Sequence, residues 1–313
     1  MNIHIEQLTI PATDGYKLAA TLFSPEEETT GPVVLINPAT GVKRTLYAQF
    51  ARFLAGRGMY VLTYDYRGIG GSRPKPLRSL KSNMEAWGTG DLAGAVDWLV
   101  ERYPRRPLLA VGHSSGGQLL GLTDRAQYVS AMLGVGAQSG YWRHWSGPRR
   151  YALACLWYAV MPAASRLLGY FPAKRLGLGE DLPGEVAREW ARWCRNPAYI
   201  CDERGVPLRP HFEEFSGPLR AYSFSDDTFA PRAAVEALLG FYRRARKEHL
   251  HLHPADLEVD SIGHFKWLRE SFRASLWEDM ASWLEQQARA VRPSAPGMRL
   301  GASQPPTQPP PLS

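Results

Sequence analysis

The feature that most constrains this chain is a series of short, uninterrupted apolar runs, separated by segments whose apolar residues recur at helical spacing. Uninterrupted runs of this length are typical of strands that are buried on both faces of a parallel sheet. Strand–helix–strand alternation predicts such a sheet with helices on both faces. The expected strands are Val33–Asn37, Tyr60–Tyr66, Pro107–Gly112, Val129–Ala137, Leu219–Ser225 and a last one around Leu257–Ser261.

Two further kinds of element complete this pattern. Residues 5–25 predict a pair of strands around the turn Asp14-Gly15. Helical spacing is present over about 44–57 and 85–103, from the glycines after residue 115 to about 125, from near Pro231, and over about 270–289. The chain is therefore expected to be an α/β protein with one large core.

The alternation stops between residues 139 and 218, where the sequence is aromatic, arginine-rich and interrupted by prolines. We interpret 139–218 as an inserted helical cap on a core formed by 1–138 and 219–289. The stretch 151–171 is apolar enough to suggest a membrane span, but it contains Pro162 and Arg166. A buried or groove-facing helix pair, without stable membrane insertion, is the expectation. The proline-rich residues 290–313 predict a disordered tail.

Composition and charge indicate the compartment and the partners that we expect. The net charge of +7 comes mainly from scattered arginines, and no basic stripe coincides with a nucleic-acid fold signature, so we expect no nucleic-acid partner. The three cysteines lack C-x-x-C spacing, which argues against a disulfide framework or a zinc site. The first ten residues show no basic region followed by an apolar one. These features predict a cytoplasmic protein without a metal.

One motif carries a candidate nucleophile. Gly112-His113-Ser114-Ser115-Gly116 has the form G-x-S-x-G and lies directly between an expected buried strand and a helix. In that context the serine occupies a strained strand-to-helix turn, which lifts its hydroxyl above the sheet. We predict Ser114 as the nucleophile. The amide of Ser115, at a helix N-terminus, is predicted to stabilise an oxyanion.

A serine nucleophile needs a base and a carboxylate that orients the base. His264 follows the last expected strand in Ser-Ile-Gly-His-Phe, and it is the predicted base. The predicted acid is Asp227, four residues before Pro231, and the adjacent Asp226 is the alternative acid. The other histidines near the C-terminus are interpreted as part of a charged surface segment: His249, His251 and His253.

The second donor of an oxyanion hole is expected in the loop 37–41. Pro38 has no N–H group to donate. Ala39 is therefore the first candidate donor and Thr40 the second.

These residues together resemble the α/β-hydrolase superfamily. Tyr64-Asp65-Tyr66-Arg67-Gly68-Ile69-Gly70-Gly71-Ser72 matches the superfamily's D-x-R-G-x-G-x-S turn, which is structural there. The chain is most similar to a bacterial group of uncharacterised, predicted α/β hydrolases in its segments 37–42, 64–70, 139–142, 225–227 and 262–265. The resemblance extends over about residues 8–285. In one departure, Asn37-Pro38 replaces the common His-Gly pair.

The resemblance implies a mostly parallel, eight-stranded sheet and a Ser–Asp–His triad. It also implies hydrolysis of an ester, thioester or amide of a small molecule through an acyl-enzyme, with no cofactor. Aromatic residues of the 139–218 segment suit either an apolar acyl pocket or the segment's own core. Alternatives are acyl transfer, cofactor-free haloperoxidase or C–C hydrolase chemistry, and a binding protein without turnover. The sequence leaves the oligomeric state open, and a homo-oligomer is compatible with it.

Overall fold

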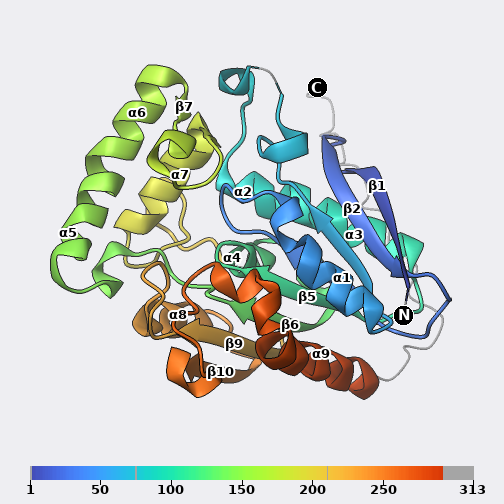
Figure 1. Ribbon diagram of the computed structural model, residues 1–313. Helices are drawn as coiled ribbons and strands as arrows, with labels where there is room; N and C mark the ends of the chain where they lie inside the picture. Colours follow the sequence, from blue (N-terminus) through green and yellow to red (C-terminus); the bar gives the residue numbers. More distant parts are fainter. Residues whose placement is uncertain (1, 75, 210, 292–313) are drawn as a thin grey trace, which may run out of the picture.

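The computed structural model describes residues 2–74, 76–209 and 211–291, and its centre is an eight-stranded sheet (Figure 1). The strand order is β1-β2-β4-β3-β5-β6-β9-β10. β1 and β2 are antiparallel to their neighbours, and the remaining strands are parallel. The predicted fold class is confirmed. The strands are β1 Ile3–Pro11, β2 Lys17–Pro25, β3 Val33–Asn37, β4 Tyr60–Tyr64, β5 Leu108–His113, β6 Val129–Val135, β9 Pro218–Phe224 and β10 Arg246–Leu252.

Helices cover both faces of this sheet because successive strand residues point to opposite sides. Val34 and Ile36 pack in a core under α1 (Ala48–Gly56) and α9 (Glu278–Ala290). Val33 and Leu35 pack in the other core, with residues of α3 (Ala93–Arg102) and α8 (Arg232–Leu239). A strand with both faces buried has no reason to alternate with polar residues, which is why β3 reads as the uninterrupted run VVLIN.

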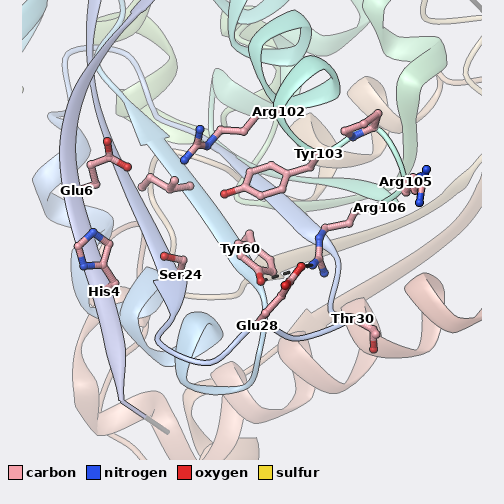
Figure 2. Close-up of a pocket in the computed structure, with 12 residues that line it drawn as sticks. His4, Glu6, Ser24, Glu28, Thr30, Tyr60, Arg102, Tyr103, Arg105 and Arg106 are labelled. Atoms are coloured by element: carbon pink, nitrogen blue, oxygen red, sulfur yellow. Dashed lines mark hydrogen bonds and ion pairs between the residues drawn. The ribbon is translucent and has the colours of Figure 1, made fainter.

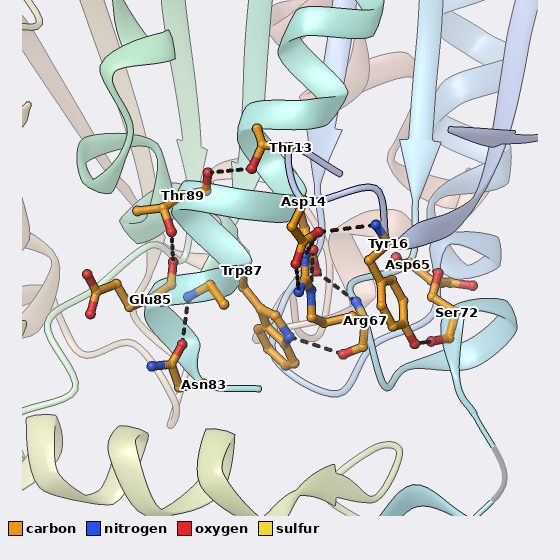
Figure 3. A network of polar contacts seen from close by, with 12 residues as sticks. Thr13, Asp14, Tyr16, Asp65, Arg67, Ser72, Asn83, Glu85, Trp87 and Thr89 are labelled. Atoms are coloured by element: carbon orange, nitrogen blue, oxygen red, sulfur yellow. Dashed lines mark hydrogen bonds and ion pairs between the residues drawn. The ribbon is translucent and has the colours of Figure 1, made fainter. Parts of the chain in front are cut away.

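The glycine-rich turn after β4 is fixed by a partly buried ion-pair network (Figure 3). The Arg67 guanidinium lies between two carboxylates, with Nε 2.6 Å from Asp91 Oδ1 and Nη1 2.6 Å from Asp14 Oδ2. Asp91 belongs to a π-helical stretch, Trp87–Leu92, that leads into α3. The Trp87 indole N–H also donates to the Arg67 carbonyl at 3.1 Å. The turn is thus tied to the start of β2 and to α3, in agreement with its predicted structural role.

The last strand differs from the expectation. Leu257–Ser261 forms no strand, and the eighth strand is β10, which pairs in parallel with β9. β10 lies at the edge of the sheet, so it carries polar side chains that hide it from a search for apolar runs. His249 and His251, expected in a surface segment, belong to this strand, and both lie 2.7 Å from Ser223 Oγ. Downstream, Glu258 adopts the left-handed conformation (φ 55°), which is incompatible with a strand.

The residues predicted to form a cap lie between β6 and β9. Their longest element is one continuous helix over 147–168, where the sequence predicted a buried or groove-facing pair. A π-helical turn, Leu156–Val160, lies just before Pro162 and lets the helix continue without that residue's N–H. This helix comprises α5 Gly147–Cys155, the π-helical turn and α6 Met161–Leu168. It is followed by β7 Tyr170–Phe171, β8 Leu182–Pro183 and α7 Gly184–Arg195.

The helix over 147–168 is long and apolar enough to cross a membrane, and only 22% of its most apolar window is buried. Figure 1 shows α5 and α6 as one rod at the outer edge of the molecule, far from β1 and β2. The predicted tail lies almost wholly outside the described residues, since α9 ends at Ala290.

Candidate active site

Ser114 stands at a sharp bend between β5 and α4 (Gly116–Leu119). Its φ of 53° is in the left-handed region, which costs a non-glycine residue energy and is typical of strained functional sites. The glycines of the motif allow close backbone packing around the bend. A Cβ at Gly116 would lie 2.1 Å from the Asn37 carbonyl oxygen, and one at Gly112 would lie 2.4 Å from Gly117 Cα. Any larger residue at either position would therefore push the bend away from the sheet.

His264 and Asp227 form a buried pair above the same sheet edge. His264 Nδ1 lies 2.7 Å from Asp227 Oδ2. Because a carboxylate accepts hydrogen bonds, we assign the ring proton to Nδ1, which leaves Nε2 free to take a proton. Asp227 Oδ1 accepts the amides of Phe229 at 2.7 Å and Ala230 at 3.1 Å. These bonds fix the carboxylate and hence the orientation of the imidazole.

Asp226 has a different position from its neighbour. Its two carboxylate oxygens accept the amides of Ile262 at 2.8 Å and Gly263 at 3.0 Å. Asp226 therefore fixes the backbone that leads to His264, while Asp227 meets the ring.

Ser114 and His264 line the same cavity, of 910 Å³. No hydrogen bond joins their side chains in the described part of the chain. The Ser114 hydroxyl instead lies 3.5 Å from Oε1 of Gln138, at the edge of hydrogen-bond distance. Gln138 is held in place, since its Nε2 donates to the Phe229 carbonyl at 3.2 Å. Contacts between a serine and a histidine of this kind are often long in the absence of substrate.

The loop after β3 uses its amides differently from the expectation. The Ala39 N–H donates to the Tyr47 hydroxyl at 2.9 Å, so the first predicted oxyanion donor is already engaged. The Thr40 amide donates to no acceptor among the described residues, and Thr40 lines the cavity. The Ser115 amide is likewise without an acceptor in the described chain. Among the candidates weighed from sequence, Thr40 and Ser115 are thus the free donors.

A buried chain of hydrogen bonds connects this loop to the His264 loop. Tyr47 Oη lies 2.8 Å from His113 Nδ1, and His113 Nε2 lies 2.9 Å from the His264 carbonyl oxygen. The carbonyl only accepts, so Nε2 carries the proton and Nδ1 accepts from Tyr47. Burial lowers the pKa of His113 well below its usual 6.5 and keeps the ring neutral, as this pattern requires. Every donor in the chain from Ala39 to His264 therefore has one defined direction.

The inserted segment supplies much of the cavity wall. The continuous helix contributes Leu153, Leu156, Trp157 and Met161. Of the segment's aromatic residues considered from sequence, Trp145, Trp157 and Phe171 line the cavity, whereas Tyr158 is exposed on the outside of the molecule. The wall is mainly apolar on this side.

A second hollow, which shares no lining residue with this cavity, is shown in Figure 2. It lies between β1, β2 and the end of α3, and Arg106 crosses it to lie 3.5 Å from Glu28 and 4.3 Å above the Tyr60 ring. It contains none of the predicted site residues. Across the described ranges, no group of three or more His, Cys, Asp or Glu side chains is placed to hold a metal ion.

Sequence reasoning missed Tyr47, His113 and Gln138. His113 was visible inside the G-x-S-x-G motif, but the motif assigns no role to that position. Tyr47 and Gln138 carry no local signal, because their partners lie 66 and 24 residues away in the chain.

The strand order is that of the α/β-hydrolase fold once the two short strands β7 and β8 are set aside. The chain has the α/β-hydrolase fold. The family model described as "Serine aminopeptidase, S33" matches residues 29–170.

Solved structures share this fold, and a curated relative matches part of the chain. An uncharacterized protein of Mycobacterium tuberculosis is 32% identical over 92 residues, which cover 29% of this chain and 30% of that protein. An α/β hydrolase from Penicillium sp. sh18 has a TM-score of 0.61 at 18% identity and covers 91% of this chain and 99% of its own. An esterase from Exiguobacterium antarcticum has a TM-score of 0.57 at 15% identity, with 89% and 99% covered.

Proposed function

We propose that the protein is a serine hydrolase that cleaves a carboxylic ester, or a related thioester or amide, through an acyl-enzyme. Ser114 is the nucleophile, His264 the base and Asp227 the residue that orients the base. The observation that carries the proposal is the buried His264–Asp227 pair at 2.7 Å, on the same cavity as a serine held at φ 53°.

The reaction begins when Ser114 Oγ attacks the carbonyl carbon and its proton passes to His264 Nε2. The negative charge that develops on the carbonyl oxygen is stabilised by the free amides of Ser115 and Thr40. The tetrahedral intermediate then collapses, and His264 gives its proton to the departing alcohol. A water molecule, deprotonated by His264, hydrolyses the acyl-enzyme and regenerates Ser114.

The lining of the cavity favours an apolar acyl group. The side chains from the continuous helix are apolar, and we propose that the inserted segment acts as a cap that shields the acyl chain from water. The charged lining residues are Lys43, Arg149, Lys174 and Glu180, and Glu180 lies 3.2 Å from Lys43. This excess of cations suits a neutral or anionic substrate. It disfavours an aminopeptidase, whose substrate presents an ammonium group.

The nucleophile is tested by covalent labelling with a fluorophosphonate probe. Wild-type protein is expected to be labelled and Ser114→Ala to remain unlabelled. Ser115→Ala is the matched control, since it removes a neighbouring hydroxyl and keeps the backbone amide. Equal labelling of Ser114→Ala and wild type would refute the assignment.

The acyl preference is tested with p-nitrophenyl esters of increasing chain length. Medium or long acyl chains are expected to give a higher kcat/KM than acetate, because more apolar surface is buried in the cavity. A sharp preference for acetate would contradict the proposed acyl pocket without touching the nucleophile assignment.

A further inference from the structure

We propose that the outer face of the continuous helix over 147–168 docks on the surface of a membrane that contains anionic lipids. The helix would lie flat in the lipid headgroup region rather than cross the bilayer. This inference concerns a surface outside the catalytic residues and does not depend on them.

Exposed apolar side chains are concentrated on this part of the molecule. Of the eleven large hydrophobic residues exposed in the described chain, seven fall within 151–178 and three more line the cavity. Only Val206 lies elsewhere. Leu167 is 84% exposed and Tyr151 68% exposed. An uncovered apolar face of this extent is a mark of an interaction surface.

The charge of the same segment indicates what covers it. Residues 141–179 contain no Asp or Glu and six basic residues, against a net charge of +7 for the whole chain. None of the six forms an ion pair with any carboxylate in the part of the chain that the structure describes. They are Arg143, Arg149, Arg150, Arg166, Lys174 and Arg175.

The arrangement along the helix fits a membrane interface. Residues 151–165 carry no charge, and arginines stand on both sides of them, at Arg149 and Arg150 before and at Arg166 after. An apolar surface with basic residues at its margins binds where acyl chains and anionic headgroups meet. An aromatic side chain also lies on this face, since Tyr158 is 55% exposed with the Arg195 guanidinium 5.4 Å from its ring centroid.

A second copy of the chain is a poorer occupant of this face. A two-fold symmetric dimer would place the unpaired cations of one segment close to those of the other. An anionic bilayer neutralises them instead. The opposite side of the helix, through Leu153, Leu156 and Trp157, lines the cavity, so docking would bring the cavity close to the lipid.

The test is sedimentation of the full chain with vesicles of phosphatidylcholine, with and without phosphatidylglycerol. Wild type is expected to bind the anionic vesicles, to bind neutral ones much more weakly, and to be released by salt. Ser114→Ala should bind as wild type does, which separates this proposal from the catalytic one.

Two pairs of variants locate the surface. Tyr151→Glu/Leu167→Glu should weaken binding by at least about tenfold, whereas Val206→Glu, which alters an exposed apolar residue elsewhere, should leave it unchanged. Arg150→Gln/Arg166→Gln should weaken binding by roughly tenfold to thirtyfold, at about 1 kcal/mol per basic residue. The control Arg102→Gln/Arg105→Gln alters two exposed arginines at the hollow of Figure 2.

Circular dichroism checks that each variant is folded. If Tyr151→Glu/Leu167→Glu is not folded, the test rests on Arg150→Gln/Arg166→Gln. Three results would overturn the proposal. The first is that wild type does not bind anionic vesicles. The second is that the glutamate pair and the glutamine pair both bind them as wild type does. The third is a wild-type dimer by light scattering that Leu167→Glu converts to a monomer, which would assign the face to a second copy.

Discussion

Tyr47 determines which backbone amide of the loop after β3 is free to bind a ligand. Its hydroxyl accepts the Ala39 N–H and donates to His113, which in turn donates to the His264 carbonyl. The Ala39 amide is thereby engaged, and the next one, at Thr40, remains free among the described residues. Both the proposed oxyanion donor and the proposed base are thus positioned by one buried, neutral chain.

Removing that hydroxyl is expected to affect turnover more than substrate binding. In Tyr47→Phe, the Ala39 amide and His113 Nδ1 lose their shared partner, and both loops relax from their aligned positions. We expect kcat for an ester substrate to fall roughly tenfold to a hundredfold with little change in KM. Steady-state kinetics measures this. Tyr60→Phe, a hydroxyl deletion at the remote hollow, is the control, and a folded Tyr47→Phe with unchanged kcat would contradict the positioning role.

The two adjacent aspartates should separate in activity. Asp227→Asn loses the charge that stabilises the protonated His264 and disturbs its tautomer, so we expect kcat to fall by about 10³–10⁴. Asp226→Asn keeps one oxygen for the two amides it holds, and a loss of about tenfold is expected. Burst-phase kinetics with a p-nitrophenyl ester compares them. A larger effect at Asp226 would reverse the assignment of the acid.

For single residues, the sequence predicts a position when a reactive side chain lies in a recognisable local backbone pattern. The bend at Ser114 was predictable because a strained turn needs glycines around it. The loop at His264 was predictable because a glycine precedes it near the C-terminal end of the core. The chain from Ala39 through Tyr47 to His113 was not predictable. It joins loops that are separated in the sequence, and only the three-dimensional packing of the strands brings them together.

Among the elements, the turn after β4 is held by Arg67 rather than by its own hydrogen bonds alone. The guanidinium connects this turn with the π-helical stretch through Asp91, whose side chain is completely buried. Burial raises the pKa of Asp91 to about 7, although the adjacent Arg67 charge lowers it. The three elements therefore depend on a carboxylate that is costly to keep charged.

Removal of the buried carboxylate of this network should destabilise the protein more than removal of the exposed one. Asp91→Ala leaves the buried side of Arg67 without a partner, and we expect the free energy of unfolding to fall by about 3 kcal/mol. Asp14→Ala removes the carboxylate whose side chain is 55% exposed, and we expect a loss of at most about 1 kcal/mol. Urea denaturation measures both. Equal losses would show that burial does not govern this pair.

The elements that the sequence did not predict correctly are those whose polarity or burial depends on their position in the fold. β10 is polar because it is an edge strand, and that position follows from the strand order rather than from its seven residues. The apolar sequence of 147–168 predicted a buried or groove-facing helix pair, and the structure has one continuous helix. One side lines the cavity and the other is exposed, a distinction that composition does not contain.

For the whole molecule, a buried neutral histidine makes stability depend on pH. In the unfolded chain His113 binds a proton near pH 6.5, whereas burial lowers its pKa well below that value in the folded protein. Below about pH 6.5 the unfolded state binds more protons than the folded state, so the free energy of unfolding falls as pH falls.

His113→Asn removes this titration. Between about pH 7.5 and about pH 5.5, wild type should lose about 1.4 kcal/mol more stability than the variant does. Urea denaturation at the two pH values gives the difference, and His4→Asn, at an exposed position, is the control. Parallel pH profiles for wild type and His113→Asn would mean that folding does not lower the pKa of this ring.

The strands on either side of the insertion are neighbours in the sheet, with Met132 paired to Leu219 and Val135 to Tyr222. Because these two strands are parallel, the chain leaves β6 at the carboxyl edge of the sheet and re-enters β9 at the amino edge, where a Cβ at Gly217 would lie 2.6 Å from the Ser130 carbonyl oxygen. The segment between them therefore contains both the helix over 147–168 and the crossover that joins two parallel strands. For engineering, an exchange of this segment has to keep the crossover, because a direct link between the two strands is too short to span the length of a strand.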